Sequence, residues 1–230
     1  MNAEELRRRE DELFAEWKTV PGVEHSMFIK DGVVDPDTYL EMKPKVMFLA
    51  REPHWEKPGV YDDMRRYLNE GVDWPRWHVI ARWTRALTTS EHVPWTDVDD
   101  EANRDFKNKE LRKIAFVNIK KQGGGASVKR EELIAYTKAC GDLVKRQIEM
   151  YKPDVIVCTG TIWLLERFIL PHTVREARRW TENDVVWFPL KDWPCAVIEM
   201  LHFTARKAHK EMYERLVNAW DEIREIVKWG

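Results

Sequence analysis

The sequence predicts an α/β fold, a three-layer α/β/α sandwich built around a short, mainly parallel central sheet. Apolar runs of strand length alternate along the chain with segments whose apolar residues recur at helical spacing. Such alternation favours parallel strands, because the connecting helices then cover both faces of the sheet. The 230 residues contain no Pro/Gly/Ser-rich linker. We therefore expect a single domain over residues 1–230, with residues 1–43 as a helical extension packed on it.

The first half of the chain contains one apolar run that is typical of a buried strand. Residues 45–50 (KVMFLA) lie between Pro44 and Pro53, and this predicts the first strand of the sheet. The other elements expected here are a charged surface helix at residues 4–17, an irregular connection at 21–43, helices at 62–69 and 75–88, and a polar helix or loop at 99–113.

The second half of the chain contains the remaining strands. The predicted elements are strands at residues 114–119, 154–160, 185–188 and 196–201, and helices at 130–151, 161–169 and 208–229. Pro153 ends the first of these helices, which has the clearest helical periodicity in the chain. We expect segments 46–49, 115–119, 155–158 and 197–201 to be neighbouring strands of one sheet.

Polar side chains stand at the ends of three predicted strands. Glu52 follows the first strand, Asn118 ends the second, and His202 follows the last. The carboxyl ends of parallel strands share one edge of a sheet, and ligands of open α/β sheets bind outside that edge. We therefore expect these three side chains to line a single cleft.

Composition restricts the class of ligand. The net charge is −2, yet residues 104–149 hold twelve basic and six acidic residues, a local excess that phosphate contacts require. The twelve tryptophans include candidates for stacking on a base. No apolar run approaches the length of a membrane span, and no His-x-x-x-His pair is present. We expect a cytoplasmic protein with no metal, no cofactor and no membrane contact, and three buried free thiols at Cys140, Cys158 and Cys195.

Four segments in this order resemble the motifs of the uracil-DNA glycosylase superfamily. They are residues 49–53 (LAREP), 115–121 (AFVNIKK), 152–160 (KPDVIVCTG) and 202–204 (HFT), and the resemblance extends over about residues 45–216. It implies a uracil-DNA glycosylase-like domain that excises a deaminated base from DNA, and so a hydrolase of N-glycosidic bonds in DNA repair. Ala50 stands where that family usually has glycine, and Phe203 where it usually has proline.

The resemblance also implies a role for each strand-end residue. Asn118 would bind the edge of the base, His202 would donate a hydrogen bond to the base oxygen on which negative charge develops, and Glu52 would position or deprotonate the attacking water. Trp55 and Tyr61 are candidates for stacking on the base. Candidates for contacting phosphates are Lys120, Lys121, the amides of Gly123, Gly124 and Gly125, and Thr204, Arg206 and Lys207.

Two alternatives remain open from the sequence. One is a nucleic-acid or nucleotide-binding module that keeps the fold and the cleft but not the reaction, which the departures at Ala50 and Phe203 favour. The other is a hydrolase of free nucleosides or nucleotides, in which the loop Gly123 to Gly125 holds a phosphate. That loop is not a Walker A motif, because no Lys-Ser/Thr follows the glycines.

Overall fold

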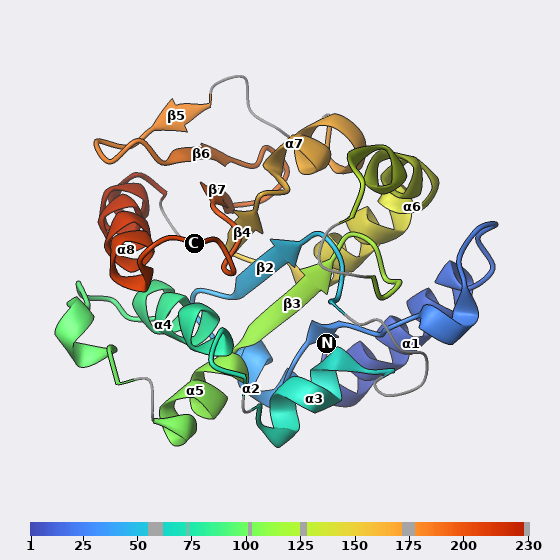
Figure 1. Cartoon of the computed structure of the whole chain (residues 1–230), viewed down its shortest axis with the longest axis horizontal. Coiled ribbons are helices and arrows are strands. Elements are labelled where there is room, and N and C mark those ends of the chain that lie inside the picture. Colours follow the sequence, from blue (N-terminus) through green and yellow to red (C-terminus); the bar gives the residue numbers. More distant parts are fainter. Residues whose placement is uncertain (55–61, 73, 101–102, 125–127, 172–177, 228–230) are drawn as a thin grey trace.

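A mixed β-sheet forms the middle layer of the molecule, which the computed structural model describes for residues 1–54, 62–72, 74–100, 103–124, 128–171 and 178–227. Over these residues the sheet has seven strands in the order β1-β3-β2-β4-β7-β6-β5 (Figure 1). The strands are β1 Gly32–Val33, β2 Val46–Ala50, β3 Ile114–Asn118, β4 Val155–Thr159, β5 Arg179–Trp180, β6 Val186–Pro189 and β7 Ala196–Met200. The central strands β3, β2, β4 and β7 are parallel neighbours. This confirms the four segments predicted to lie side by side.

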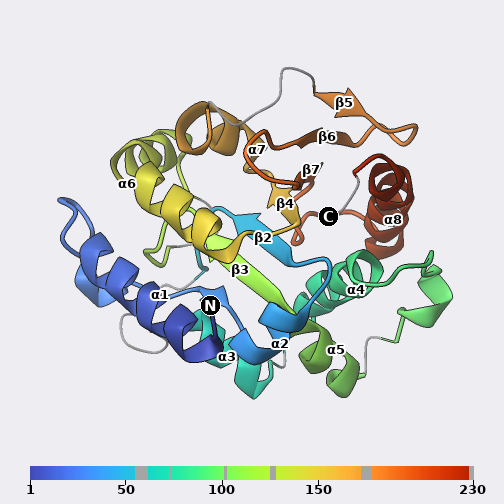
Figure 2. The same ribbon diagram turned by 180° about the vertical axis from the view of Figure 1, so that it is seen from behind.

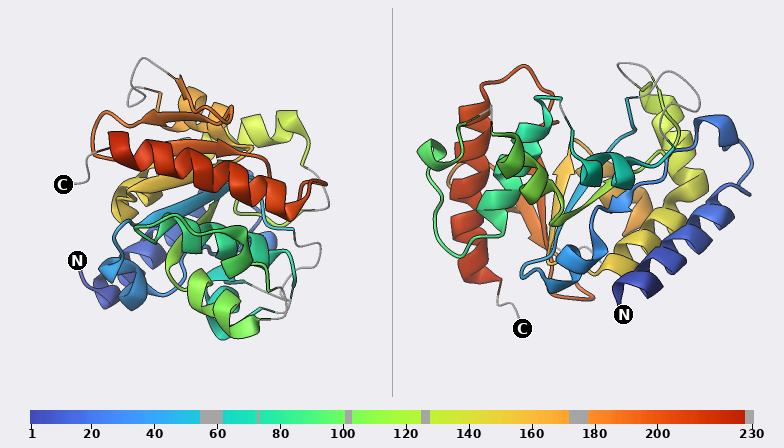
Figure 3. Two further views of the ribbon diagram at one scale, coloured as in Figure 1. Left: turned by 90° about the vertical axis from the view of Figure 1, so that its left-hand side faces the viewer. Right: turned by 90° about the horizontal axis from the view of Figure 1, so that it is seen from below.

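Helices cover both faces of this sheet. The described helices are α1 Ala3–Trp17, α2 Pro36–Glu41, α3 Met64–Glu70, α4 Trp77–Leu87, α5 Arg104–Leu111, α6 Arg130–Tyr151, α7 Ile162–Leu164 and α8 His209–Ile226. A π-helical turn, Leu165–Ile169, continues α7, and short 3₁₀ turns lie at His25–Met27 and Trp95–Asp97. Helices α1, α6 and α7 lie on one face, and α4, α5 and α8 on the other (Figures 2 and 3). The mixed α/β architecture therefore has three layers.

Two apolar cores fill the spaces between the layers. Val46, Phe48 and Ala50 of β2 belong to the core shared with α4 and α8, whereas Met47 and Leu49 belong to the core shared with α1 and α6. All five residues of β2 are buried. Because both faces of this strand are covered, its sequence is continuously apolar instead of alternating with polar residues.

The N-terminal region is more ordered than its sequence suggests. Residues 21–43 were predicted to be irregular, but they contain β1 and α2. Asp35 caps α2 by accepting a hydrogen bond from the Thr38 amide, and Pro36 occupies the first turn. Helix α1 is not merely a surface helix. Its apolar residues Leu6, Leu13, Phe14 and Trp17 are buried in the core shared with α6, and Glu10 is buried as well.

Both edges of the sheet end in very short strands. β1 pairs antiparallel with β3 through two residues, and β5 pairs antiparallel with β6 through two residues. β6 in turn runs antiparallel to β7. The parallel strands thus lie in the interior of a mixed sheet.

Two further expectations concern single residues and the chain as a whole. Cys140, Cys158 and Cys195 are free and buried, as predicted. Among the helices that the structure describes, none combines the length and the hydropathy that crossing a membrane requires.

Candidate functional site

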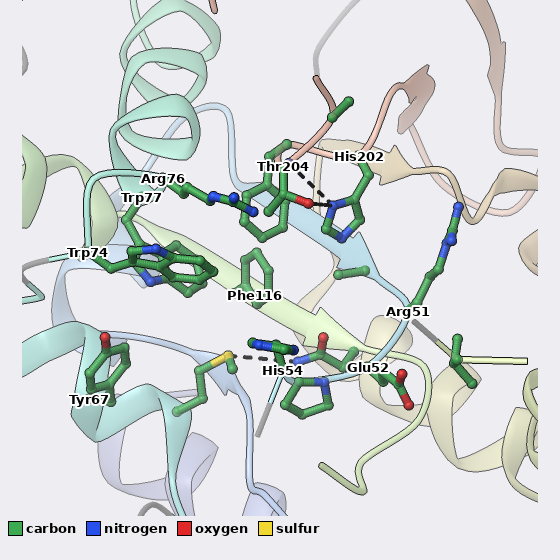
Figure 4. Close-up of a pocket in the computed structure, with 17 residues that line it drawn as sticks. Arg51, Glu52, His54, Tyr67, Trp74, Arg76, Trp77, Phe116, His202 and Thr204 are labelled. Atoms are coloured by element: carbon green, nitrogen blue, oxygen red, sulfur yellow. Dashed lines mark hydrogen bonds between the residues drawn. The ribbon is translucent and has the colours of Figure 1, made fainter. Parts of the chain in front are cut away.

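The carboxyl ends of β2, β3 and β7 open into one cleft of about 510 Å³. Asn118 is the last residue of β3, while Glu52 and His202 each follow their strand by two residues. All three residues line the cleft (Figure 4). The parallel register explains this, because Ala50 pairs with Asn118 and both strands end at the same edge. The convergence predicted from the strand pattern is therefore confirmed.

Two contacts from Thr204 orient the His202 ring. The Thr204 backbone N–H donates to His202 Nδ1 over 3.3 Å, and Thr204 Oγ1 lies 2.8 Å from the same nitrogen. An amide N–H can only donate, so Nδ1 is an acceptor and the proton of the neutral ring is on Nε2. Burial, followed by the positive charges of Arg51 and Arg76, lowers the pKa of His202 to about 4. At neutral pH His202 is an uncharged Nε2–H donor.

Asn118 is held by a buried carboxylate. Asp31 Oδ2 accepts hydrogen bonds from the Asn118 backbone N–H, over 2.7 Å, and from Asn118 Nδ2, over 3.1 Å. Nδ2 also lies 3.7 Å from the sulfur of Met64. The opposite amide orientation would place the carboxamide oxygen against the carboxylate, which is repulsive. Asn118 therefore keeps its nitrogen toward Asp31 and has its oxygen left to accept a hydrogen bond from a ligand.

The prediction that Lys121 contacts a phosphate is wrong. Its side chain is fully buried, and Nζ donates to Asp31 Oδ1 over 2.5 Å, to the Asn118 carbonyl over 2.8 Å and to Gln147 Oε1 over 2.8 Å. All three donors of the ammonium are thus used inside the protein. Lys121 neutralises Asp31, and so it supports Asn118 from behind instead of contacting a ligand.

Lys120 also has carboxylate partners. Its ammonium lies 2.8 Å from Glu52 Oε2 and 2.6 Å from Glu132 Oε1, and only 7 % of the residue is exposed. Burial opposes the charge of Lys120, but the hydrogen bonds and charges of the two carboxylates outweigh it and raise its pKa. Lys120 is therefore engaged with Glu52 at the cleft, and Glu52 is one half of a nearly buried ion pair.

The glycine loop closes on Glu52 instead of forming a phosphate cradle. The amide of Gly123 donates to the Met27 carbonyl over 3.0 Å, and that of Gly124 donates to the Pro53 carbonyl over 3.1 Å. A Cβ at Gly124 would lie 2.8 Å from Glu52 Oε2, so any side chain here would require the Glu52 carboxylate to move. The prediction that these two amides hold phosphate is wrong, and Gly125 lies outside the described residues.

Aromatic side chains form the wall of the cleft opposite Glu52. The predicted stacking residues Trp55 and Tyr61 lie outside the described residues. The aromatic lining that the structure shows comes from Tyr67, Trp74, Trp77, Phe116 and Phe203. Phe203, at the position where the resemblance calls for proline, stacks on the His202 ring with centroids 4.5 Å apart. Trp74 is 37 % exposed and is therefore accessible to a ligand.

Of the remaining residues predicted to contact phosphate, only one lines the cleft. Thr204 lines the cleft, whereas Arg206 does not belong to its lining. Lys207 pairs with Glu211 over 2.9 Å and lines a neighbouring cavity. The basic residues that do line the cleft are Arg51 and Arg76, which the sequence prediction missed. The sequence could have pointed to Arg51, because it is the first charged residue after β2 and therefore lies at the edge of the sheet where the cleft was expected.

No protein-family model matches this chain, and no curated protein matches its sequence significantly. Within the described part of the chain, no group of three or more His, Cys, Asp or Glu side chains is placed to hold a metal ion.

Proposed function

We propose that the protein is a uracil-DNA glycosylase-like enzyme, in fold and in activity, which excises a deaminated base from nucleic acid, most simply DNA, by hydrolysing the N-glycosidic bond. The observation that carries this proposal is the shared cleft, where Glu52, Asn118 and His202 meet at the carboxyl ends of parallel strands. The four segments of the resemblance fall on β2, β3 and β4 and directly after β7, which are neighbours.

His202 suits the stabilisation of a base that leaves as an anion. In this reaction the bond to the sugar breaks through an oxocarbenium-like transition state, and negative charge grows on a carbonyl oxygen of the base. An uncharged Nε2–H whose ring is fixed by Thr204 is a preorganised donor for that oxygen. Such a donor contributes about 3–4 kcal/mol at comparable sites.

Asn118 defines which edge of a base fits. Since its carboxamide nitrogen is bound to Asp31, the oxygen is the group left for a ligand. The base must then present an N–H at this point, as the imide N–H of uracil does. A base edge that carries only acceptors here would leave a buried oxygen unpaired, which is costly.

Two side chains are candidates for acting on the water. Glu52 lines the cleft, where its ion pair with Lys120 holds the carboxylate in place to accept a hydrogen bond from the water. His54 also lines the cleft and projects into it (Figure 4). We assign the positioning of water to Glu52 and His54 together.

The Glu52–Lys120 pair also favours a second candidate function, a binding module that recognises a base without cleaving it. In that case Glu52 and Lys120 serve only to hold the glycine loop against the end of β2. The free-nucleotide hydrolase loses its main support, because the amides of Gly123 and Gly124 are already bound to backbone carbonyls.

An oligonucleotide assay separates these functions. Single- and double-stranded oligonucleotides carrying uracil or other deaminated bases are incubated with the protein and scored for abasic sites. We expect excision, and we expect His202→Ala to slow it by about 10²-fold or more with little loss of affinity. His92→Ala is the matched control, since His92 is exposed and pairs with Asp221 away from the cleft. Binding without abasic sites from any base would favour the binding module.

A further inference from the structure

Two arginines flank His202 at the cleft. Arg51 follows β2, and Arg76 immediately precedes α4. In Figure 4 the His202 ring lies between their side chains. Arg51 and His202 also line a second cavity of about 280 Å³, which Arg76 does not line. The two guanidinium groups therefore face different sides of the same imidazole.

Neither arginine has an acidic partner among the residues that the structure describes, in contrast to the buried Arg65, which binds Glu10 and Asp63. Arg51 instead extends over the backbone of Gly160, where a Cβ would lie 2.9 Å from its Nη2. Arg76 lies over the ring of Trp74, 5.4 Å from the centroid. Uncharged contacts thus hold both guanidinium groups at the cleft and leave their charge uncompensated.

The charge of the cleft favours an anion. Glu52 is the one acidic residue in the described lining, and Lys120 neutralises it. Arg51 and Arg76 are close enough to His202 to lower its pKa, so the cleft carries positive charge that an anionic ligand can neutralise. Guanidinium groups bind phosphate through paired N–H donors, which makes phosphate the natural anion for each of them.

We propose that Arg51 and Arg76 bind the two phosphates that flank a single nucleotide, so that the cleft receives an internal nucleotide of a strand. In a strand, one phosphate lies on each side of every sugar. If the N-glycosidic bond lies next to His202, the arginines on the two sides of His202 are placed to bind these two phosphates. This inference rests on the proposed function, because it takes the ligand to be a nucleotide. It goes further in excluding a free nucleotide as the preferred ligand.

Binding of four small probes tests this assignment without any need for base excision. They are 2′-fluoro-2′-deoxyuridine, its 3′-monophosphate, its 5′-monophosphate and its 3′,5′-bisphosphate; the fluorine slows cleavage by disfavouring the oxocarbenium ion. Affinities are measured by calorimetry at low salt. We expect each phosphate to strengthen binding by about tenfold, so that the bisphosphate binds about 100-fold more tightly than the nucleoside.

Two variants assign the phosphates. Arg51→Gln should abolish the gain from one monophosphate only, Arg76→Gln the gain from the other, and each should weaken the bisphosphate by about tenfold. Arg9→Gln, at an exposed position on α1, is the control for the change in net charge. The inference is overturned if the bisphosphate binds no better than a monophosphate, or if both variants affect the same monophosphate.

The outcome is separable from that of the oligonucleotide assay. Bisphosphate binding that depends on both arginines, in a protein that makes no abasic sites, would retain this inference and reject the glycosylase activity. The opposite outcome is also possible. If the protein excises bases from oligonucleotides, but its Arg51→Gln and Arg76→Gln variants bind all four probes as the wild type does, then only the inference about the arginines is rejected.

Discussion

At the scale of single residues, the state of His202 is decided by its neighbours on either side. The Thr204 amide fixes the tautomer from within the same turn, while Arg51 and Arg76 oppose a second proton. Phe203 stacks on the ring and contributes to its burial. A histidine in this state serves as a hydrogen-bond donor that does not depend on pH near neutrality.

We predict that His202 titrates with a pKa of about 4 and carries its proton on Nε2 above that pH. Two-dimensional ¹⁵N NMR of the imidazoles, with His202→Ala for assignment, measures both properties. The folded pKa lies below the ordinary value of 6.5. As pH falls from about 6.5 to about 4, the unfolded chain binds this proton first, so the free energy of unfolding should decrease more in the wild type than in His202→Ala. An Nδ1–H tautomer at pH 7 would contradict the donor role.

Two adjacent lysines with the same sequence context have different surroundings in the structure. Lys120 and Lys121 were both expected to contact phosphate, yet one salt-bridges Glu52 and the other is buried against Asp31. Both lysines follow β3 at a bend of the chain, and nothing local identifies which of the two side chains will be covered by α1 and α6. The distinction depends on tertiary packing.

Substituting each lysine by methionine should separate their roles. Lys121→Met leaves Asp31 charged and unpaired in the interior, and we expect a loss of about 3–5 kcal/mol in the free energy of unfolding. Lys120→Met should cost less, because one of its partners, Glu132, is exposed and can be solvated. Urea denaturation monitored by circular dichroism provides the comparison. Equal losses in the two variants would be inconsistent with the buried pair.

At the scale of elements, the loop that follows β3 supports the loop that follows β2. Gly124 forms an isolated parallel bridge with His54, and its missing side chain leaves room for the Glu52 carboxylate. The glycines that suggested a phosphate cradle are thus explained by the contact of two protein segments. A glycine-rich sequence is compatible with either role, a phosphate-binding loop or a loop packed closely against another segment.

A double-mutant cycle tests this contact. Gly124→Ala should destabilise the wild type by about 1–3 kcal/mol, because the methyl group must displace Glu52 from Lys120. In a Glu52→Ala background the same substitution should hardly change the free energy of unfolding, since the carboxylate that the new methyl group would meet is absent. Thermal unfolding of the four proteins measures the coupling. A cost that persists without Glu52 would place the strain elsewhere in the loop.

At the scale of the whole molecule, the four parallel strands were predictable because burial on both faces makes each of them mostly apolar, with the half-buried Glu199 of β7 as an exception. The common edge followed from their direction, and with it the meeting of Glu52, Asn118 and His202. Elements β1 and α2 were not predictable, since two strand residues and a six-residue helix leave too short a pattern. The roles of Arg51 and Arg76 depend on which carboxylates fold nearby, and the sequence does not specify this.

The distribution of unpaired charge predicts a weak dependence of binding on salt. The basic excess of residues 104–149 overstates the charge available to a ligand, because Lys120 and Lys121 are paired within the protein. With two phosphates bound, at Arg51 and Arg76, the plot of log affinity for a single-stranded oligonucleotide against log salt should have a slope of about −1.4. Fluorescence anisotropy at several salt concentrations measures it. Arg76→Gln should halve the slope, and a much steeper slope would indicate phosphate contacts elsewhere.

The brevity of the outermost strands β1 and β5 bears on how copies of this protein meet in concentrated solution. A long open strand exposes a row of unpaired N–H and C=O groups on which a strand from another molecule can add. Here each edge of the described sheet offers only two residues, Gly32–Val33 on one side and Arg179–Trp180 on the other. The apolar strands β2 and β4 have a composition typical of aggregating segments, but they lie inside the sheet. β2 has two strands on one side and four on the other, and β4 has three on each side. Any self-association of the folded protein should therefore use side-chain surfaces instead of continued β-pairing.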